Sequence, residues 1–147
     1  MDQKIPLAEQ AKTIRENSVG WKIQQISGRL SREMTRELAE EQLKLDHFVL
    51  LMRLAEHENI TQTQLGDGVS MPNYAITRAL DHLEALKLVE RRPDAHSRRA
   101  YRVFLTETGR ALMPELFKVV QRVNAKLLAP LPKEMQLQLI AALDVLL

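Results

Sequence analysis

The stretch TQTQLGDGVSMPNYAITRALDHLEALKLVERRPDAHSRRAYRVFLT, residues 61–106, contains the start and stop signals of two short helices and a hairpin. Thr61 and Gln64 have the spacing of a capping box, which predicts a brief helix over residues 62–69. Ser70 and Pro72 then favour a new helix start, and apolar residues recur at helical spacing. The inward set is Ile76, Leu80, Leu83 and Leu86, and the outward set is Asn73, Tyr74, Thr77, Arg78 and Asp81. Two helices therefore meet at a short turn.

The second half of this stretch predicts a β-hairpin with a basic tip. Residues 88–92 and 101–105 are the expected strands, with Tyr101, Val103 and Leu105 on one face, and residues 93–99 form the tip. From Lys87 to Arg102, six cationic and two anionic side chains give a local net charge of +4, whereas the rest of the chain sums to −2. By itself, such a cluster is equally compatible with an ordinary solvated face.

N-terminal to this region, two amphipathic helices are expected. An apolar stripe at three- and four-residue steps predicts a helix of five or more turns, made by Val19, Ile23, Ile26, Leu30, Met34 and Leu38. Asp46 is the expected N-cap of the next helix, which ends near Asn59. Its predicted inward residues are Phe48, Leu51, Met52 and Ala55.

C-terminal to the hairpin, two more amphipathic helices are expected. Thr106 caps the first, and Pro114 is expected to bend it early. Its stripe comprises Leu112, Leu116, Val120, Val123 and Leu127. Pro132 opens the last helix, whose apolar residues are Leu137, Ile140, Leu143 and Leu147. An apolar tail of this kind requires a partner surface.

Composition narrows the class of protein. The chain has 147 residues, 45% of them hydrophobic and 27% charged, and a formal net charge of +2, which predicts one folded domain. No apolar run is long enough for a transmembrane helix, and the first residues lack a signal-peptide pattern, so we expect a cytoplasmic protein. The absence of cysteine excludes disulfides, thiol redox sensing and cysteine-ligated zinc.

The order helix, helix, turn, helix, hairpin is that of a winged helix-turn-helix, a mainly α-helical fold with a small β wing. The sequence further resembles the MarR family of bacterial transcription regulators over nearly its whole length, through residues 61–92 and the segment DAHSRRAYRVFLTETGR. The family's wing signature falls on Ser97, Arg99, Leu105 and Thr106, with Ser97 replacing an Asp that braces the tip arginine. Asp94 is a candidate substitute for that brace. The family's recognition-helix arginine matches Arg78, and its turn glycine is Ser70 here.

Candidate site residues follow from these positions. The expected DNA contacts are Asn73, Tyr74, Thr77 and Arg78 on the recognition helix and Arg98 and Arg99 on the wing. Two of them have structural alternatives, because Arg78 could pair with Asp81 or Glu84, and Tyr74 could belong to the core. Trp21 and His47 are candidate ligand-binding residues, with packing between helices as the alternative. His47 and His82 lack the partner spacing of a metal site, so neither metal nor cofactor is expected.

These observations predict a single domain over residues 1–147. Residues of about 10–44 and 107–147 form dimerisation helices, and residues of about 45–106 form the winged module. The resemblance implies a homodimer on a pseudo-palindromic double-stranded operator, and a repressor released by a small aromatic or phenolic acid. A winged-helix module that binds protein without DNA is the alternative. An enzyme is not expected, because no nucleophile, base and orienting group cluster in the sequence.

Overall fold

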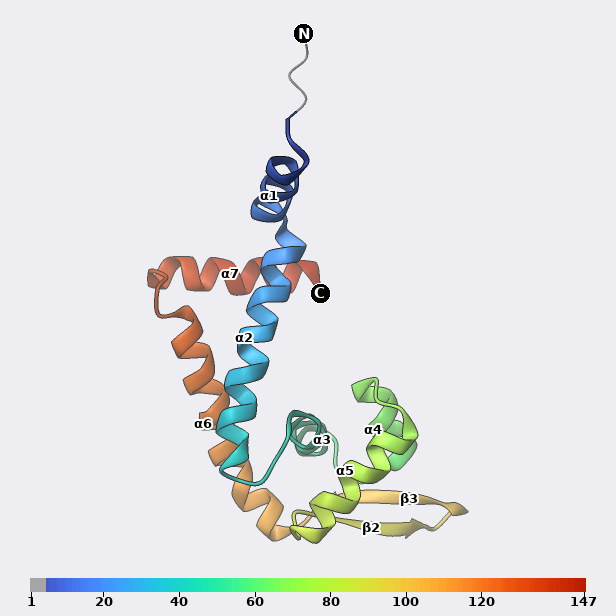
Figure 1. Cartoon of the computed structure of the whole chain (residues 1–147). Coiled ribbons are helices and arrows are strands. Elements are labelled where there is room, and N and C mark those ends of the chain that lie inside the picture. Colours follow the sequence, from blue (N-terminus) through green and yellow to red (C-terminus); the bar gives the residue numbers. More distant parts are fainter. Residues whose placement is uncertain (1–4) are drawn as a thin grey trace.

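The computed structural model describes residues 5–147, so the first four residues of the predicted domain lie outside the described part of the chain. Within it, seven helices and three strands follow one another (Figure 1). They are α1 (Leu7–Asn17), α2 (Val19–Ala39), α3 (Leu45–Glu56), β1 (Ile60–Thr61), α4 (Gln62–Val69), α5 (Asn73–Ala85), β2 (Val89–Asp94), β3 (Ser97–Leu105), α6 (Glu107–Leu128) and α7 (Lys133–Leu146). This is the predicted winged helix-turn-helix with long flanking helices.

The wing is an antiparallel three-stranded sheet in the order β1-β3-β2. Val89 pairs with Leu105, and pairing continues to Pro93 with Tyr101 and, after an irregularity, Asp94 with Ser97. The predicted tip at residues 93–99 was therefore too long, because backbone hydrogen bonds extend both strands into it. Arg98 and Arg99 consequently lie on β3, close to the turn.

The helix starts next to the wing follow the predicted caps. Thr61 Oγ1 accepts a hydrogen bond from Gln64 N at 3.1 Å, and Gln64 Oε1 accepts one from Thr61 N at 2.9 Å. Thr106 Oγ1 accepts from Gly109 N at 2.9 Å. Gly109 lies so near the residue that precedes β2 that a Cβ there would be 2.0 Å from the carbonyl oxygen of Leu88. The base of the wing is thus clamped to the first turn of α6.

The core lies where α2 and α6 pack against the winged module, which includes α3. On α3 and α6 the buried residues differ in part from those that were predicted to face inward. Helix α3 begins at Leu45 with Lys44 as N-cap, so Asp46 lies in the first turn and is not the cap. Leu50 and Leu54 are fully buried, whereas Ala55 is exposed, because α3 packs on several elements at once. On α6 the buried residues are Gly109, Met113, Leu116, Val119 and Val123, and Leu112, Val120 and Leu127 lie at the margin.

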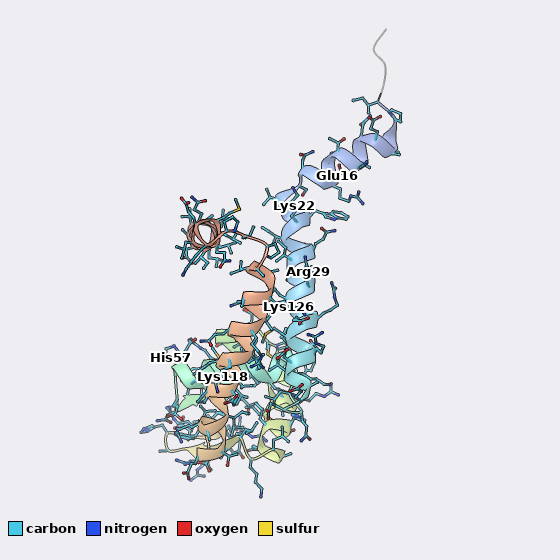
Figure 2. All side chains as sticks on the ribbon, turned by 90° about the vertical axis from the view of Figure 1, so that its left-hand side faces the viewer. Glu16, Lys22, Arg29, His57, Lys118 and Lys126 are labelled. Carbon is cyan, nitrogen blue, oxygen red and sulfur yellow. The ribbon has the colours of Figure 1, made fainter. Side chains whose placement is uncertain are left out.

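The two ends of the chain leave apolar surface uncovered. Ser18 is the N-cap of α2 and separates it from α1, a helix that the sequence reading did not resolve. The N-terminal half of the predicted stripe on α2 is exposed, including Val19, Ile23 and Ile26. Helix α7 starts after Pro132 as predicted but has no buried residue. It crosses α2 in the view of Figure 1, and the turned view of Figure 2 shows it apart from α2.

Candidate nucleic-acid interface

Helix α5 presents the polar face that the periodicity predicted. Ser70, in the left-handed conformation with φ of 54°, ends α4, and Pro72 is the N-cap of α5. Ile76, Ala79, Leu80 and Leu83 anchor one side of α5 in the core, and Leu86 is half-buried. Asn73, Tyr74, Thr77, Arg78 and Asp81 are exposed on the other side. Tyr74 is 70% exposed, so its core alternative is wrong.

The carboxylates of α5 are occupied by an arginine of the wing. Arg91 donates from its backbone N to Glu84 Oε1 at 2.9 Å and from Nε to Glu84 Oε2 at 3.1 Å, and its guanidinium also pairs with Asp81. The hydrogen bonds from Arg91 hold the pKa of Glu84 below its usual value. The alternative that Arg78 pairs with these acids is therefore wrong, since they bind Arg91. No ion pair involves Arg78 among residues 5–147, which leaves its charge available on the exposed face.

The basic cluster of the wing divides into two groups. Arg92 pairs with Glu90 and stacks over the Phe104 ring at 4.2 Å, which fixes it on the sheet. Arg98 and Arg99 are exposed and form no salt bridge within the described residues. Positive charge at the wing is thus partly structural and partly free.

Asp94 stabilises the turn of the wing and does not brace Arg99. Its carboxylate accepts from His96 N at 3.1 Å and lies 3.4 Å from Arg102 Nε. The pKa of Asp94 is lowered, first by the His96 backbone N–H and then by Arg102. Arg102 in turn donates to the carbonyl oxygen of Asn59 at 2.7 Å, which ties the turn to the start of β1. The brace therefore acts on the strand that carries Arg98 and Arg99.

A shallow groove joins the recognition helix to the wing. About 240 Å³ in volume, it is lined by Thr61, Gln62, Thr63, Asn73, Arg99, Ala100 and Tyr101. It brings together Asn73 and Arg99, two predicted site residues from different elements. Tyr101 was predicted on one face of the hairpin with Val103 and Leu105; Val103 and Leu105 are buried, whereas Tyr101 is 49% exposed because it lies beyond the edge of the core. Gln62 and Thr63 were missed, since their position between the two capping-box residues gave no sign of which surface they would join.

The two candidate ligand residues lie in different parts of the protomer. Trp21 is in the first turn of α2 and is half exposed, whereas His47 is buried in the first turn of α3. His47 Nδ1 accepts from Lys44 N at 3.0 Å, and its ring stacks on His82 at 4.2 Å. Burial and the neighbouring His82 lower the pKa of His47. No group of three or more metal-ligating side chains occurs among residues 5–147.

A second depression lies between α2 and α6, above the winged module. Its volume is about 280 Å³, and the lining residues are Arg29, Leu30, Arg32, Glu33, Val123, Lys126 and Leu127. Figure 2 labels Arg29 on α2 and Lys126 on the neighbouring α6. Lys126 pairs with Glu33, whereas Arg29 and Arg32 form no salt bridge in the described part of the chain. The lining thus combines cationic side chains, one carboxylate that is paired with Lys126, and apolar side chains.

Comparison with known proteins agrees with this geometry. A sequence model described as MarR family matches residues 41–100. The reduced form of MarR from E. coli superimposes with a TM-score of 0.83 at 25% identity, covering 88% of this chain and 96% of that one. A MarR family protein of Mycobacterium tuberculosis, solved in complex with DNA, has a TM-score of 0.79 at 26% identity, covering 88% and 97% of the two chains.

The M. tuberculosis MarR family protein has also been solved in complex with salicylic acid, and that structure has a TM-score of 0.71 at 25% identity, covering 99% of each chain. In the described residues, no helix is long and apolar enough to cross a membrane. Residues 41–100 thus match the MarR family, and the long flanking helices complete the fold of its solved members. Over residues 41–100 the chain is therefore similar to the MarR family, and it shares the fold of solved MarR-family proteins, one of them in complex with DNA.

Proposed function

We propose that this protein is a cytoplasmic, homodimeric repressor that inserts α5 into the major groove of its operator and the wing into the adjacent minor groove. The observation that carries this proposal is the charge on α5. Because Arg91 pairs with both Asp81 and Glu84, neither acid pairs with Arg78, which forms no ion pair within residues 5–147 and keeps its charge available on the exposed polar face. A cation on such a face can approach phosphates or the acceptor edge of guanine. Asn73, Tyr74 and Thr77 share the exposed side with it.

The wing supplies the second contact. Arg98 and Arg99 are exposed on β3 and form no salt bridge within residues 5–147, and Arg99 also lines the groove that leads to Asn73. Arginine is attracted to the negative potential of a narrow minor groove. The DNA complex of the M. tuberculosis relative supports this arrangement, since that protein shares the fold over 88% of the present chain.

Dimerisation is supported by the apolar surface of the terminal helices. Helix α7 has no buried residue in the protomer, and α2 leaves Val19, Ile23 and Ile26 exposed. An amphipathic helix in water normally derives its stability from packing, so these faces need a partner. A second copy of the chain would join residues of about 10–44 and 107–147 across a two-fold axis. Two winged modules would then meet half-sites about 10 bp apart on one face of DNA.

Release by a small aromatic or phenolic acid completes the proposal. The salicylic acid complex of the M. tuberculosis relative supports this class of ligand. In the present chain, Arg29 and Arg32 over Leu30 and Val123 offer a carboxylate and an aromatic ring complementary surfaces. Trp21 remains a candidate contact from the N-terminal part of α2. His47 is only 7% exposed and would require a local rearrangement to touch a ligand.

The test begins with selection of operator DNA from random fragments by the purified protein. Arg78→Ala should weaken specific binding by about 1–3 kcal/mol and relax preference at one position per half-site. Arg99→Ala should weaken binding and reduce the slope of log affinity against log salt by about one per wing. Arg92→Ala is the matched control, because Arg92 is held on the sheet by Glu90 and Phe104. Failure to select any sequence, or unchanged affinity in both site variants, would overturn the proposal.

A further inference from the structure

The hydroxyl group of Thr77 is occupied by protein partners. Its Oγ1 donates to the carbonyl oxygen of Asn73 at 3.0 Å, one turn earlier on α5. The same oxygen accepts a hydrogen bond from Gln62 Nε2 at 2.9 Å. A threonine hydroxyl has a single proton and two lone pairs. Its proton is therefore used, and one of its two acceptor positions is filled.

These two hydrogen bonds also fix the side chain. Threonine is stiff at χ1, and a hydroxyl held between two partners selects one rotamer. Thr77 is nevertheless exposed on the same side of α5 as Tyr74 and Arg78. The part of the side chain that remains without a partner is chiefly the methyl group. Thr77 thus offers a groove an apolar point, although it is a polar residue by type.

We propose that Thr77 is a specificity-determining residue that recognises thymine through contact between its methyl group and the C5-methyl group of the base, with Gln62 as the positioning residue. The inference rests on the proposed function, because it assumes that α5 enters the major groove. Thymine alone among the four bases carries a methyl group on that edge, and a threonine methyl is a suitable contact for it. A hydroxyl that cannot donate gives no comparable preference for another base.

The size of the effect follows from the burial of a single methyl group. Removing one buried methyl contact corresponds to about fourfold in affinity. A dimer that meets two half-sites would lose this factor twice, which is about 15-fold for the whole operator. Deoxyuridine is the direct probe, because it pairs like thymidine and lacks only the C5-methyl group.

The experiment uses the full-length protein and the operator fragment that it selects, with each thymine replaced in turn by deoxyuridine in both half-sites. The wild type should lose about 15-fold at one symmetric pair of positions. Thr77→Ser keeps the hydroxyl and removes the methyl, so it should bind the thymine and uracil fragments equally. Thr77→Val keeps methyl groups and cannot form either hydrogen bond. Because valine in a helix is held in one χ1 rotamer by its own branching, whereas threonine divides between two, the valine needs no positioning by Gln62 and should retain a preference for thymine.

Gln62→Ala tests the positioning role separately. This variant should lower the thymine-to-uracil affinity ratio toward one. Its melting temperature should stay close to that of the wild type, since Thr77 is exposed and Gln62 is only half-buried. Equal binding of the wild type to all uracil fragments would overturn this inference and leave the proposed function intact. Loss of the thymine preference in Thr77→Val would assign the readout to the hydroxyl and also overturn it. Absence of any sequence-specific binding would instead overturn the proposed function.

Discussion

Removing three apolar side chains from α7, in the variant Leu137→Ala/Ile140→Ala/Leu143→Ala, is expected to dissociate the proposed dimer without unfolding the protomer. The three side chains are 63%, 49% and 42% exposed, so about half of each remains to be covered by a partner. Full burial of such a residue stabilises by about 1.5–3 kcal/mol, which leaves about 1 kcal/mol for each. A two-fold interface counts every residue twice, so the total is about 6 kcal/mol, or roughly 10⁴-fold in the dimer dissociation constant.

Sedimentation equilibrium over a wide concentration range measures this constant directly. Alanine preserves helix propensity, and α7 contributes no buried residue to the protomer, so circular dichroism should show little loss of helix in the winged module. Gln138→Ala, on the same exposed helix, is the matched control and should leave the dimer unchanged. A triple variant with wild-type dimer affinity would refute the assignment of α7 to the interface. An unfolded protomer would show that α7 stabilises the core, contrary to its exposure.

Two further predictions concern stability. Gly109→Ala should destabilise the protein by about 3 kcal/mol, because the new Cβ would lie 2.0 Å from the carbonyl oxygen of Leu88. Gly28→Ala should instead stabilise α2 by about 0.5–1 kcal/mol, because a Cβ there meets only an ordinary contact at 3.5 Å and alanine favours a helix more than glycine does. Urea denaturation compares the two, and equal midpoints would contradict the close approach at Gly109. The pKa of His47 is lower in the folded protein than in the unfolded chain, so below about pH 6.5 the unfolded state binds more protons than the folded state. The contribution of His47 to the free energy of unfolding is therefore present above that pH and is lost on acidification. His47→Gln keeps an acceptor for the backbone N–H at the start of α3 without a titrating group, and unfolding curves from pH 7.5 to 5 should be flatter for it than for the wild type. Identical pH dependence would exclude His47 as the source.

Contacts in the tertiary structure occupy several arginines that the sequence grouped into one basic cluster. Arg91 and Arg102 belong to the basic cluster by sequence, yet the first is bound to Glu84 and Asp81 and the second to Asp94 and Asn59. Asn59 and Arg102 are 43 residues apart in the chain, so no local pattern could connect them. The free charge at the wing is thus smaller than the count of arginines indicated, and it resides on Arg98 and Arg99.

The same limit applies to packing between helices. The sequence predicted an amphipathic α3 but placed Ala55 inward, because a stripe several residues wide does not define which arc faces the larger neighbour. The stacking of His47 on His82 joins α3 to α5 and has no counterpart in residue spacing. The hydrogen bond from Gln62 to Thr77 is of the same kind, because it depends on how α4 lies against α5.

What the sequence determined by itself are the features that depend on a few neighbouring residues or on one repeated period. Thr61 with Gln64, Thr106 and Pro132 define helix starts, because their effects act within one turn of the backbone. The exposed face of α5 followed from the 3.6-residue period. Only the tertiary structure decided which cations are free, which hydroxyl is occupied and which apolar faces stay uncovered, because each of these depends on atoms that distant segments bring within a few ångströms.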